Sequence, residues 1–136
     1  MEFHYGRLFD HVHLRVADLG ASKRFYHTVL YALDRELGAE GQDFFISDEL
    51  FITKADERVS HIHLAFQAED RESVDRFYEA ALTAGGTDNG PPGERDYHPG
   101  YYAAYVLDPD GNNIEAVFHG PASRSAASVV IDADQP

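Results

Sequence analysis

Two stretches of the sequence alternate between apolar and other residues in the same way, fifty residues apart. They cover residues 9–16 and 61–66. The apolar sets are Val12, Leu14 and Val16, and then Ile62, Leu64 and Phe66; the opposite sets are His11, His13 and Arg15, and then His61, His63 and Ala65. A strict period of two is typical of a strand with one buried face. Both stretches are therefore expected to be half-buried strands.

A helical pattern follows each of these strands. Both predicted helices carry the sequence Arg-Phe-Tyr, at residues 24–26 and again at 76–78, within apolar faces of helical spacing. The expected N-caps are Asp18 for the first helix, and Glu69 or Asp70 for the second, which should end at Gly85-Gly86. A strand and a helix that recur together indicate an internal duplication.

The remaining segments complete two similar halves. The expected elements are a short strand at 35–39, a hairpin from 44–46 to 50–53, a long loop at 87–100, a hairpin from 101–107 to 114–118 around the turn 108–112, and a tail from 121 with one short strand at 128–131. We expect an α+β fold of two βαβββ modules, about 7–56 and 57–120, in one domain of residues 1–120 with the tail 121–136.

The charge balance narrows the class of protein. The chain has 136 residues, with 24 Asp and Glu against 11 Lys and Arg, and a net charge of −13. Such an acidic chain is a poor partner for nucleic acid or for an anionic membrane. It has no cysteine, which excludes disulfides and a thiol nucleophile. We find no signal peptide or membrane-spanning run, so a cytoplasmic protein is expected.

The histidines suggest a metal centre. His11 and His61 occupy equivalent positions in the two halves, and Glu115 should point away from the apolar face of its strand. Two histidines and one carboxylate form the facial ligand set of non-haem iron centres, which zinc, manganese or nickel can also use. Spacing alone does not favour His11 over His13, because an i, i+2 pair on one strand can itself chelate a metal. A solvated strand residue is the ordinary alternative for Glu115.

Further candidates could move protons near such a centre. Imidazole titrates near neutrality, so His13, His63 and His98 are candidate catalytic residues, together with Tyr97. Tyr97 and His98 lie in the long loop beside Tyr101 and Tyr102, where they could line or cover a site. An aromatic cluster beside Pro and Gly is equally well explained by packing within the loop.

Three stretches of the sequence resemble the vicinal oxygen chelate superfamily, which includes glyoxalase I, fosfomycin-modifying thiol transferases, bleomycin-resistance proteins and extradiol dioxygenases. They are residues 10–19 with the helix that follows, residues 60–66, and residues 108–115, Asp-Pro-Asp-Gly-Asn-Asn-Ile-Glu. The resemblance covers roughly residues 8–119. It implies paired βαβββ modules whose mixed sheet curls around a central cavity with a metal site.

The resemblance also implies roles for individual residues. The ligands would be His11, His61 and Glu115, which leaves His13 and His63 as supporting or substrate-facing residues. The fourth ligand of glyoxalase I, a Glu, would fall at about Phe51 or Ile52, where this chain has no carboxylate. This difference argues against glyoxalase I activity itself.

The resulting expectation is a metal-dependent glyoxalase- or dioxygenase-like enzyme. It would use one divalent ion (Fe, Zn, Mn or Ni) and act on a small substrate with neighbouring oxygens. The alternatives are a metal-free protein that sequesters a small molecule such as an antibiotic, as bleomycin-resistance proteins do, and a fosfomycin-type thiol transferase. We expect a homodimer, and the sequence leaves open whether the metal site lies within one chain or between two.

Overall fold

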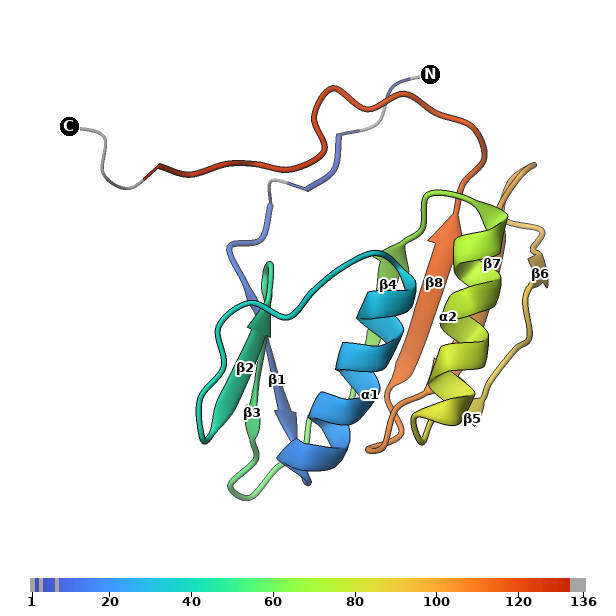
Figure 1. Cartoon of the computed structure of the whole chain (residues 1–136). Coiled ribbons are helices and arrows are strands. Elements are labelled where there is room, and N and C mark those ends of the chain that lie inside the picture. Colours follow the sequence, from blue (N-terminus) through green and yellow to red (C-terminus); the bar gives the residue numbers. More distant parts are fainter. Residues whose placement is uncertain (1, 3, 7, 133–136) are drawn as a thin grey trace.

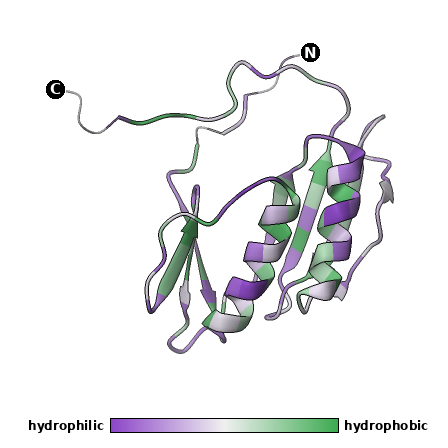
Figure 2. Cartoon of the chain, viewed as in Figure 1, coloured by the Kyte–Doolittle hydropathy of each residue, from purple (hydrophilic) through white to green (hydrophobic). Residues whose placement is uncertain are grey.

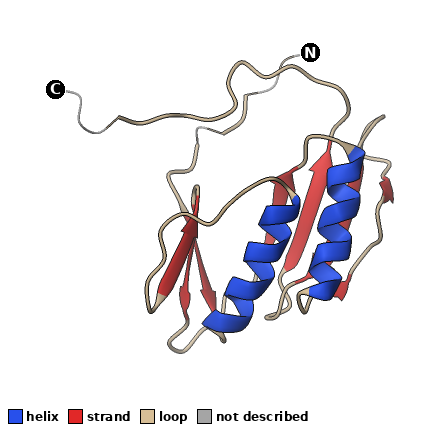
Figure 3. Cartoon of the chain, in the orientation of Figure 1, coloured by secondary structure: helices blue, strands red, loops and turns tan. Residues whose placement is uncertain are grey.

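Each half of the chain contributes one helix and a sheet of its own (Figure 1). The computed structural model describes residues 2, 4–6 and 8–132. The elements in chain order are β1 (Val12–Val16), α1 (Leu19–Ala32), β2 (Phe44–Ser47), β3 (Leu50–Lys54), β4 (His63–Gln67), α2 (Arg71–Thr83), β5 (Thr87–Asp88), β6 (Gly93–Glu94), β7 (Tyr102–Leu107) and β8 (Asn113–Phe118). Figure 3 shows the same elements coloured by type. The predicted α+β class with a duplicated strand and helix pattern is confirmed.

The two sheets share one pairing scheme. The first sheet has the strand order β1-β3-β2, and the second has the order β4-β8-β7-β5, with β6 also paired to β7. In both, the first strand of the module runs parallel to its last strand, which pairs antiparallel with the strand before it. The described strands do not close into a barrel. The duplication visible in the sequence is thus also a duplication of strand pairing.

The helices begin where their caps predict. Asp18 accepts a hydrogen bond from the backbone of Ala21 at 3.0 Å, and Asp70 accepts one from Ser73 at 2.7 Å. Each bond satisfies an amide that the first helical turn leaves without a partner. Between the two predicted caps of α2, the structure selects Asp70 over Glu69. Gly85, with φ +93°, continues the chain after α2 in a conformation that favours glycine.

One apolar core joins the two modules. α1 packs against α2, and α2 covers β7 and β8, with apolar positions turned toward this core (Figure 2). Its fully buried members include Phe25 and Val29 of α1, Phe77 of α2, and Ile114 of β8. Neither helix of the described residues covers the face of the second sheet opposite α2. That uncovered face carries the candidate site.

Several predicted boundaries need correction. β1 begins at Val12 and β4 at His63, so His11 and His61 lie just outside the strands. No strand forms at 35–39, where Gly38 and Ala39 bond only to Ile46 and Glu40 makes one bridge to Phe45. Gly38 within this segment and Gly41 just after it disfavour an extended run.

The long loop and the tail also differ from the prediction. Residues 87–100 contain β5 and β6, because the edge of β7 offers backbone groups that pair with them. Residues 128–131 form no strand and are exposed (Figure 3). Two predicted parts lie outside the described residues. They are the end of the tail, 133–136, and Arg7, the expected first residue of the first module. Neither described helix is long and apolar enough to cross a membrane.

Candidate functional site

The site is built around a buried carboxylate on the uncovered face of the second sheet. Ile114 and Ala116 of β8 point into the core, so the period of the strand turns Glu115 to the opposite face. Its neighbours across the sheet are Ala65 of β4 and Tyr105 of β7. Glu115 is nevertheless only 2% exposed. The sequence-based placement of Glu115 opposite the apolar face agrees with this geometry.

Two side chains donate hydrogen bonds to Glu115. His63 Nε2 lies 2.9 Å from one carboxylate oxygen, and the hydroxyl of Tyr101 donates to the other. Burial, and then the hydrogen bond and charge of Glu115, raise the pKa of Tyr101. Burial and the charge of Glu115 likewise raise the pKa of Tyr105. Both phenols therefore remain protonated at neutral pH, and Tyr101 serves as a hydrogen-bond donor.

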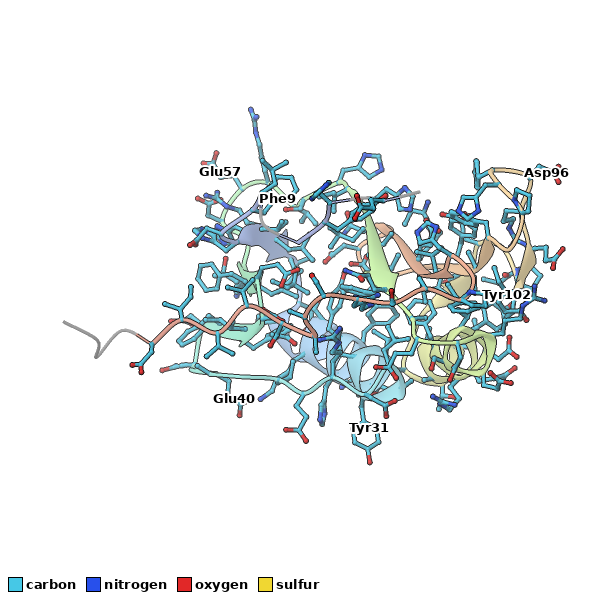
Figure 4. The ribbon with its side chains drawn as sticks, turned by 90° about the horizontal axis from the view of Figure 1, so that it is seen from above. Phe9, Tyr31, Glu40, Glu57, Asp96 and Tyr102 are labelled. Carbon is cyan, nitrogen blue, oxygen red and sulfur yellow. The ribbon has the colours of Figure 1, made fainter. Side chains whose placement is uncertain are left out.

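A cluster of rings extends the site along the end of β8. Tyr101 packs edge-on against Tyr97, His98 and His119, with centroids 4.9 to 5.3 Å apart. His98 Nε2 and His119 Nδ1 are 2.9 Å apart. Tyr97 is largely exposed at the rim. Asp96, which precedes it, lies on the side of the molecule opposite Tyr31 of α1 (Figure 4). Of the aromatic residues predicted to line a site, Tyr101 bonds to Glu115, and Tyr97 and His98 pack against Tyr101. Tyr102 instead donates a hydrogen bond to Asp75 of α2, on the other face of the sheet. His119, which sequence reasoning missed, joins the ring cluster.

The histidines of the first module meet different partners. His13 Nε2 lies 2.7 Å from Thr53 Oγ1, and its ring stacks on Phe51 at 4.7 Å. His11 Nδ1 lies 2.6 Å from Asp10, and its side chain is 59% exposed. The His11 ring also lies edge-on to Phe51, at 6.4 Å between centroids. The ring contacts of both histidines are therefore with Phe51 of the first sheet and not with the Glu115 site.

The strand register locates the counterpart of Glu115 in the first module. His13 lies opposite Phe51 in the first sheet, and His63 lies opposite Asn113 in the second. Thr53 and Glu115 each follow these partners by two residues, so Thr53 occupies the position that Glu115 occupies in the second module. The expected place of a fourth ligand, Phe51 or Ile52, is therefore corrected to Thr53. A threonine there leaves the conclusion unchanged, because it supplies no carboxylate.

The three predicted metal ligands do not assemble within one chain. His61 is exposed and precedes β4, whose start is held by a bond from the Ile62 amide to Asn112. Across residues 2, 4–6 and 8–132, no three His, Asp or Glu side chains are close enough together to hold a metal ion. The donor types suit a divalent ion, but the residues of a single chain do not fit one.

The turn before β8 holds the site in position. Asp108, which is buried, accepts bonds from the amides of Asp110 and Asn112, from the Asn112 side chain, and from the Tyr26 hydroxyl at 2.5 Å. Burial, and then Asp108, raise the pKa of Tyr26. Asn112 in turn accepts the Ile62 amide at 2.8 Å. This turn ties α1 of the first module to the strands that carry Glu115 and His63.

Comparisons with known proteins agree with this architecture. The model of the Glyoxalase/Bleomycin resistance protein/Dioxygenase superfamily matches residues 8–116. A crystal structure of a glyoxalase/bleomycin resistance protein from Albidiferax ferrireducens T118 is 36% identical, with a TM-score of 0.72, covering 81% of this chain and 98% of that one. No curated protein matches significantly.

Two more distant structures share the fold. A lactoylglutathione lyase from Agrobacterium tumefaciens is 19% identical, with a TM-score of 0.61, and the alignment covers 83% of this chain and 94% of that one. The oxidase ChaP-H2 is 22% identical, with a TM-score of 0.58, and the alignment covers 88% and 95%. At these identities the likeness concerns the fold alone. The match of the family model over most of the chain shows that this protein belongs to the Glyoxalase/Bleomycin resistance protein/Dioxygenase superfamily.

Proposed function

We propose that the protein is an enzyme that acts on a small oxygen-bearing substrate, with Glu115 as its acid–base group. One observation carries the proposal: Glu115 is 2% exposed on a sheet face that neither described helix covers. Removing a carboxylate from water is costly unless it is paired and hydrogen-bonded. A strand that only needed packing would carry an apolar residue here, so the retained charge favours chemistry.

The neighbours of Glu115 suit proton transfer. His63 is half exposed and adjoins one carboxylate oxygen, so a substrate bound over the face would meet the imidazole and the carboxylate together. Tyr101 remains a phenol and can donate to an oxygen of the substrate or to Glu115. Glu115 would accept a proton from the substrate and return it to the product. The names of two structural neighbours, a lyase and an oxidase, support the assignment to an enzyme.

A metal-assisted form of this activity needs a second copy of the chain. The ligand set would be Glu115 and His61 of one chain with His11 of the other, in a homodimer whose first and second sheets face one another. A bound Fe, Zn, Mn or Ni ion would supply Lewis-acid polarisation of the substrate oxygens. Protein side chains would still bind the substrate and move its proton.

A metal-free binding protein is the second candidate. It is favoured by the separation of the three predicted ligands within the described part of one chain. The half-exposed aromatic side chains of the first sheet, Phe44 and Phe51, which meet edge-on at 6.1 Å, would suit a planar ligand. Such a protein would bind its ligand stoichiometrically without turnover, and chelators would not release it.

Metal content and turnover separate these candidates. Protein purified anaerobically without chelator is analysed by elemental mass spectrometry and light scattering, and tested against a panel of small compounds with two neighbouring oxygens. We compare wild type with Glu115→Gln and His11→Ala, and with Thr53→Val as the matched control. Turnover that Glu115→Gln lowers by about 10²–10⁴-fold, with Thr53→Val near wild type, supports the enzyme.

The metal measurement then assigns the mechanism. About one equivalent of metal per chain in a dimer, lost in both Glu115→Gln and His11→Ala, supports the shared site. Turnover without metal supports Glu115 acting alone. Ligand binding without turnover, unchanged by chelator, contradicts the enzyme proposal and favours the binding protein.

A further inference from the structure

His98 and His119 form a hydrogen-bonded pair at the edge of the site. His98 Nδ1 lies 2.9 Å from the carbonyl oxygen of Pro99, and His98 Nε2 lies 2.9 Å from His119 Nδ1. The two rings are nearly parallel, at 18°. Both nitrogens of His98 and one nitrogen of His119 are therefore engaged within the protein.

These contacts determine which nitrogens carry protons. A carbonyl oxygen only accepts, so His98 Nδ1 must be the donor to Pro99. In neutral His98 the other nitrogen, Nε2, is then an acceptor, and His119 Nδ1 must donate to it. Neutral His119 is left with an unprotonated Nε2. The Pro99 carbonyl thus sets the tautomer of His119 through His98.

The backbone holds this pair against the site. Tyr101 lies between the pair and the carboxylate, with its ring edge-on to His119 and its hydroxyl on Glu115. Gly100, at φ +90°, lets the loop approach the end of β8, where an added Cβ would stand 3.4 Å from the His119 carbonyl oxygen. His119 follows β8 at an even spacing from Glu115, which places it on the same side of the strand.

We propose that His119 is a second acid–base group of the Glu115 site, and that His98 is a positioning residue that keeps His119 Nε2 free to accept a proton. This assignment rests on the proposed function. His119 Nε2 would take a proton from the substrate, and the Nδ1 proton would then be shared with His98 Nε2. The positive charge would spread over both rings, and the same proton would return to the product, so the cycle needs no further reactant.

The electrostatic surroundings agree with a base. Burial, and then the neighbouring His98, lower the pKa of His119, while Glu115 opposes this shift. The other ionisable group in contact with His119 is Tyr101, which remains neutral because its own pKa is raised. The free imidazole of His119 therefore predominates at neutral pH, as proton acceptance requires.

Nitrogen-15 NMR of histidine-labelled protein tests the tautomer directly. In the wild type, His119 should be neutral with the proton on Nδ1. In His98→Phe, which keeps a ring but has no acceptor, His119 should shift to the Nε2–H tautomer that free histidine favours. His98→Gln, whose side-chain oxygen accepts a hydrogen bond, should restore the wild-type form. A His119 that carries its proton on Nε2 in the wild type, or does not respond to His98→Phe, overturns the proposal.

The acid–base role of His119 is tested by steady-state kinetics, with a substrate found in the panel of compounds. His119→Gln should lower kcat by about 10²-fold or more and remove one limb of its pH profile. His98→Phe should lower kcat by about 10–100-fold, as losing the partner of a metal-bound imidazole does, and His98→Gln should recover most of it. An unchanged kcat in His119→Gln overturns the proposed role of His119. An unchanged kcat in Glu115→Gln instead overturns the proposed function, and the NMR experiment then decides only the tautomer of His119.

Discussion

The two modules make the same histidine contact with different partners. On β1, His13 Nε2 lies 2.7 Å from the hydroxyl of Thr53; on β4, His63 Nε2 lies 2.9 Å from the carboxylate of Glu115. The register shows that the two pairs are equivalent positions of one repeated sheet. The duplication therefore preserved the scaffold and the histidine while the opposing residue diverged.

The difference lies in what surrounds each pair. Tyr101 bonds to Glu115, and Tyr105 of β7 flanks it, so the carboxylate is enclosed by groups that can donate or polarise. Around His13 the neighbours are Phe51, stacked on its ring, and the half-exposed side chain of Thr53. In the proposed function, the face of the second sheet would move protons, whereas the face of the first sheet exposes aromatic rings. Repeated pairing geometry alone does not make a site.

The largest expected effect comes from making the second module resemble the first. Glu115→Thr should lower turnover of a substrate from the panel by about 10²–10⁴-fold, because it removes the acid–base group and leaves His63 with a hydroxyl. Steady-state kinetics measure the loss. A variant with near wild-type kcat would show that the carboxylate does not act in the reaction.

The reverse exchange, Thr53→Glu, is the matched control. It gives His13 a carboxylate on the exposed face of the first sheet, where an ion pair contributes about 0–1 kcal/mol. Turnover should stay within a few-fold of wild type, since the neighbours of Glu115 have no counterpart there. Combined with Glu115→Thr, it should not restore activity. If the double variant regained turnover, the two sheet faces would be interchangeable, and the surroundings of Glu115 would have no special role.

The next largest effect is expected on the free energy of unfolding, for variants in the two turns that precede β3 and β8. Asp108→Ala removes the acceptor of four hydrogen bonds, and each buried donor left unpaired costs about 1–3 kcal/mol. Asp48 lies in the turn before β3 at φ +52°, and Asp48→Gly should stay within about 1 kcal/mol of wild type. Urea unfolding measures both. Equal stability of the two variants would contradict a structural role for Asp108 in joining the modules.

The sequence predicted the repeated elements well because their patterns are local. Alternation in β1 and β4, helical spacing in α1 and α2, and the capping residues Asp18 and Asp70 each depend on a few neighbouring residues. The outward direction of Glu115 followed from the same period of two. These features are dictated by backbone geometry and by burial of one face.

The contacts of the site depend on long-range pairing, which local patterns do not contain. Only the register of β3 and β8 shows that Thr53 is equivalent to Glu115. The contact between Tyr101 and Glu115 depends on how the loop meets the end of β8. His119 lies one residue past its strand, and only its even spacing from Glu115 pointed to the site. The separation of His11 from Glu115 within one chain depends on how the two sheets are placed.

The smallest effect concerns pH, and it again distinguishes the two modules. The lowered pKa of His119 means that the unfolded chain binds a proton more readily than the folded one. The contribution of His119 to stability is complete above its pKa in the unfolded chain, about 6.5. This contribution is lost as the pH falls through the lowered pKa of the folded state. Because the side chain is partly exposed, we expect less than about 1 kcal/mol. His119→Gln should flatten the fall in unfolding free energy below pH 6.5, measured by urea titration, whereas His27→Gln on the exposed side of α1 should not. Parallel pH dependence in both variants and the wild type would show that His119 is not the group responsible.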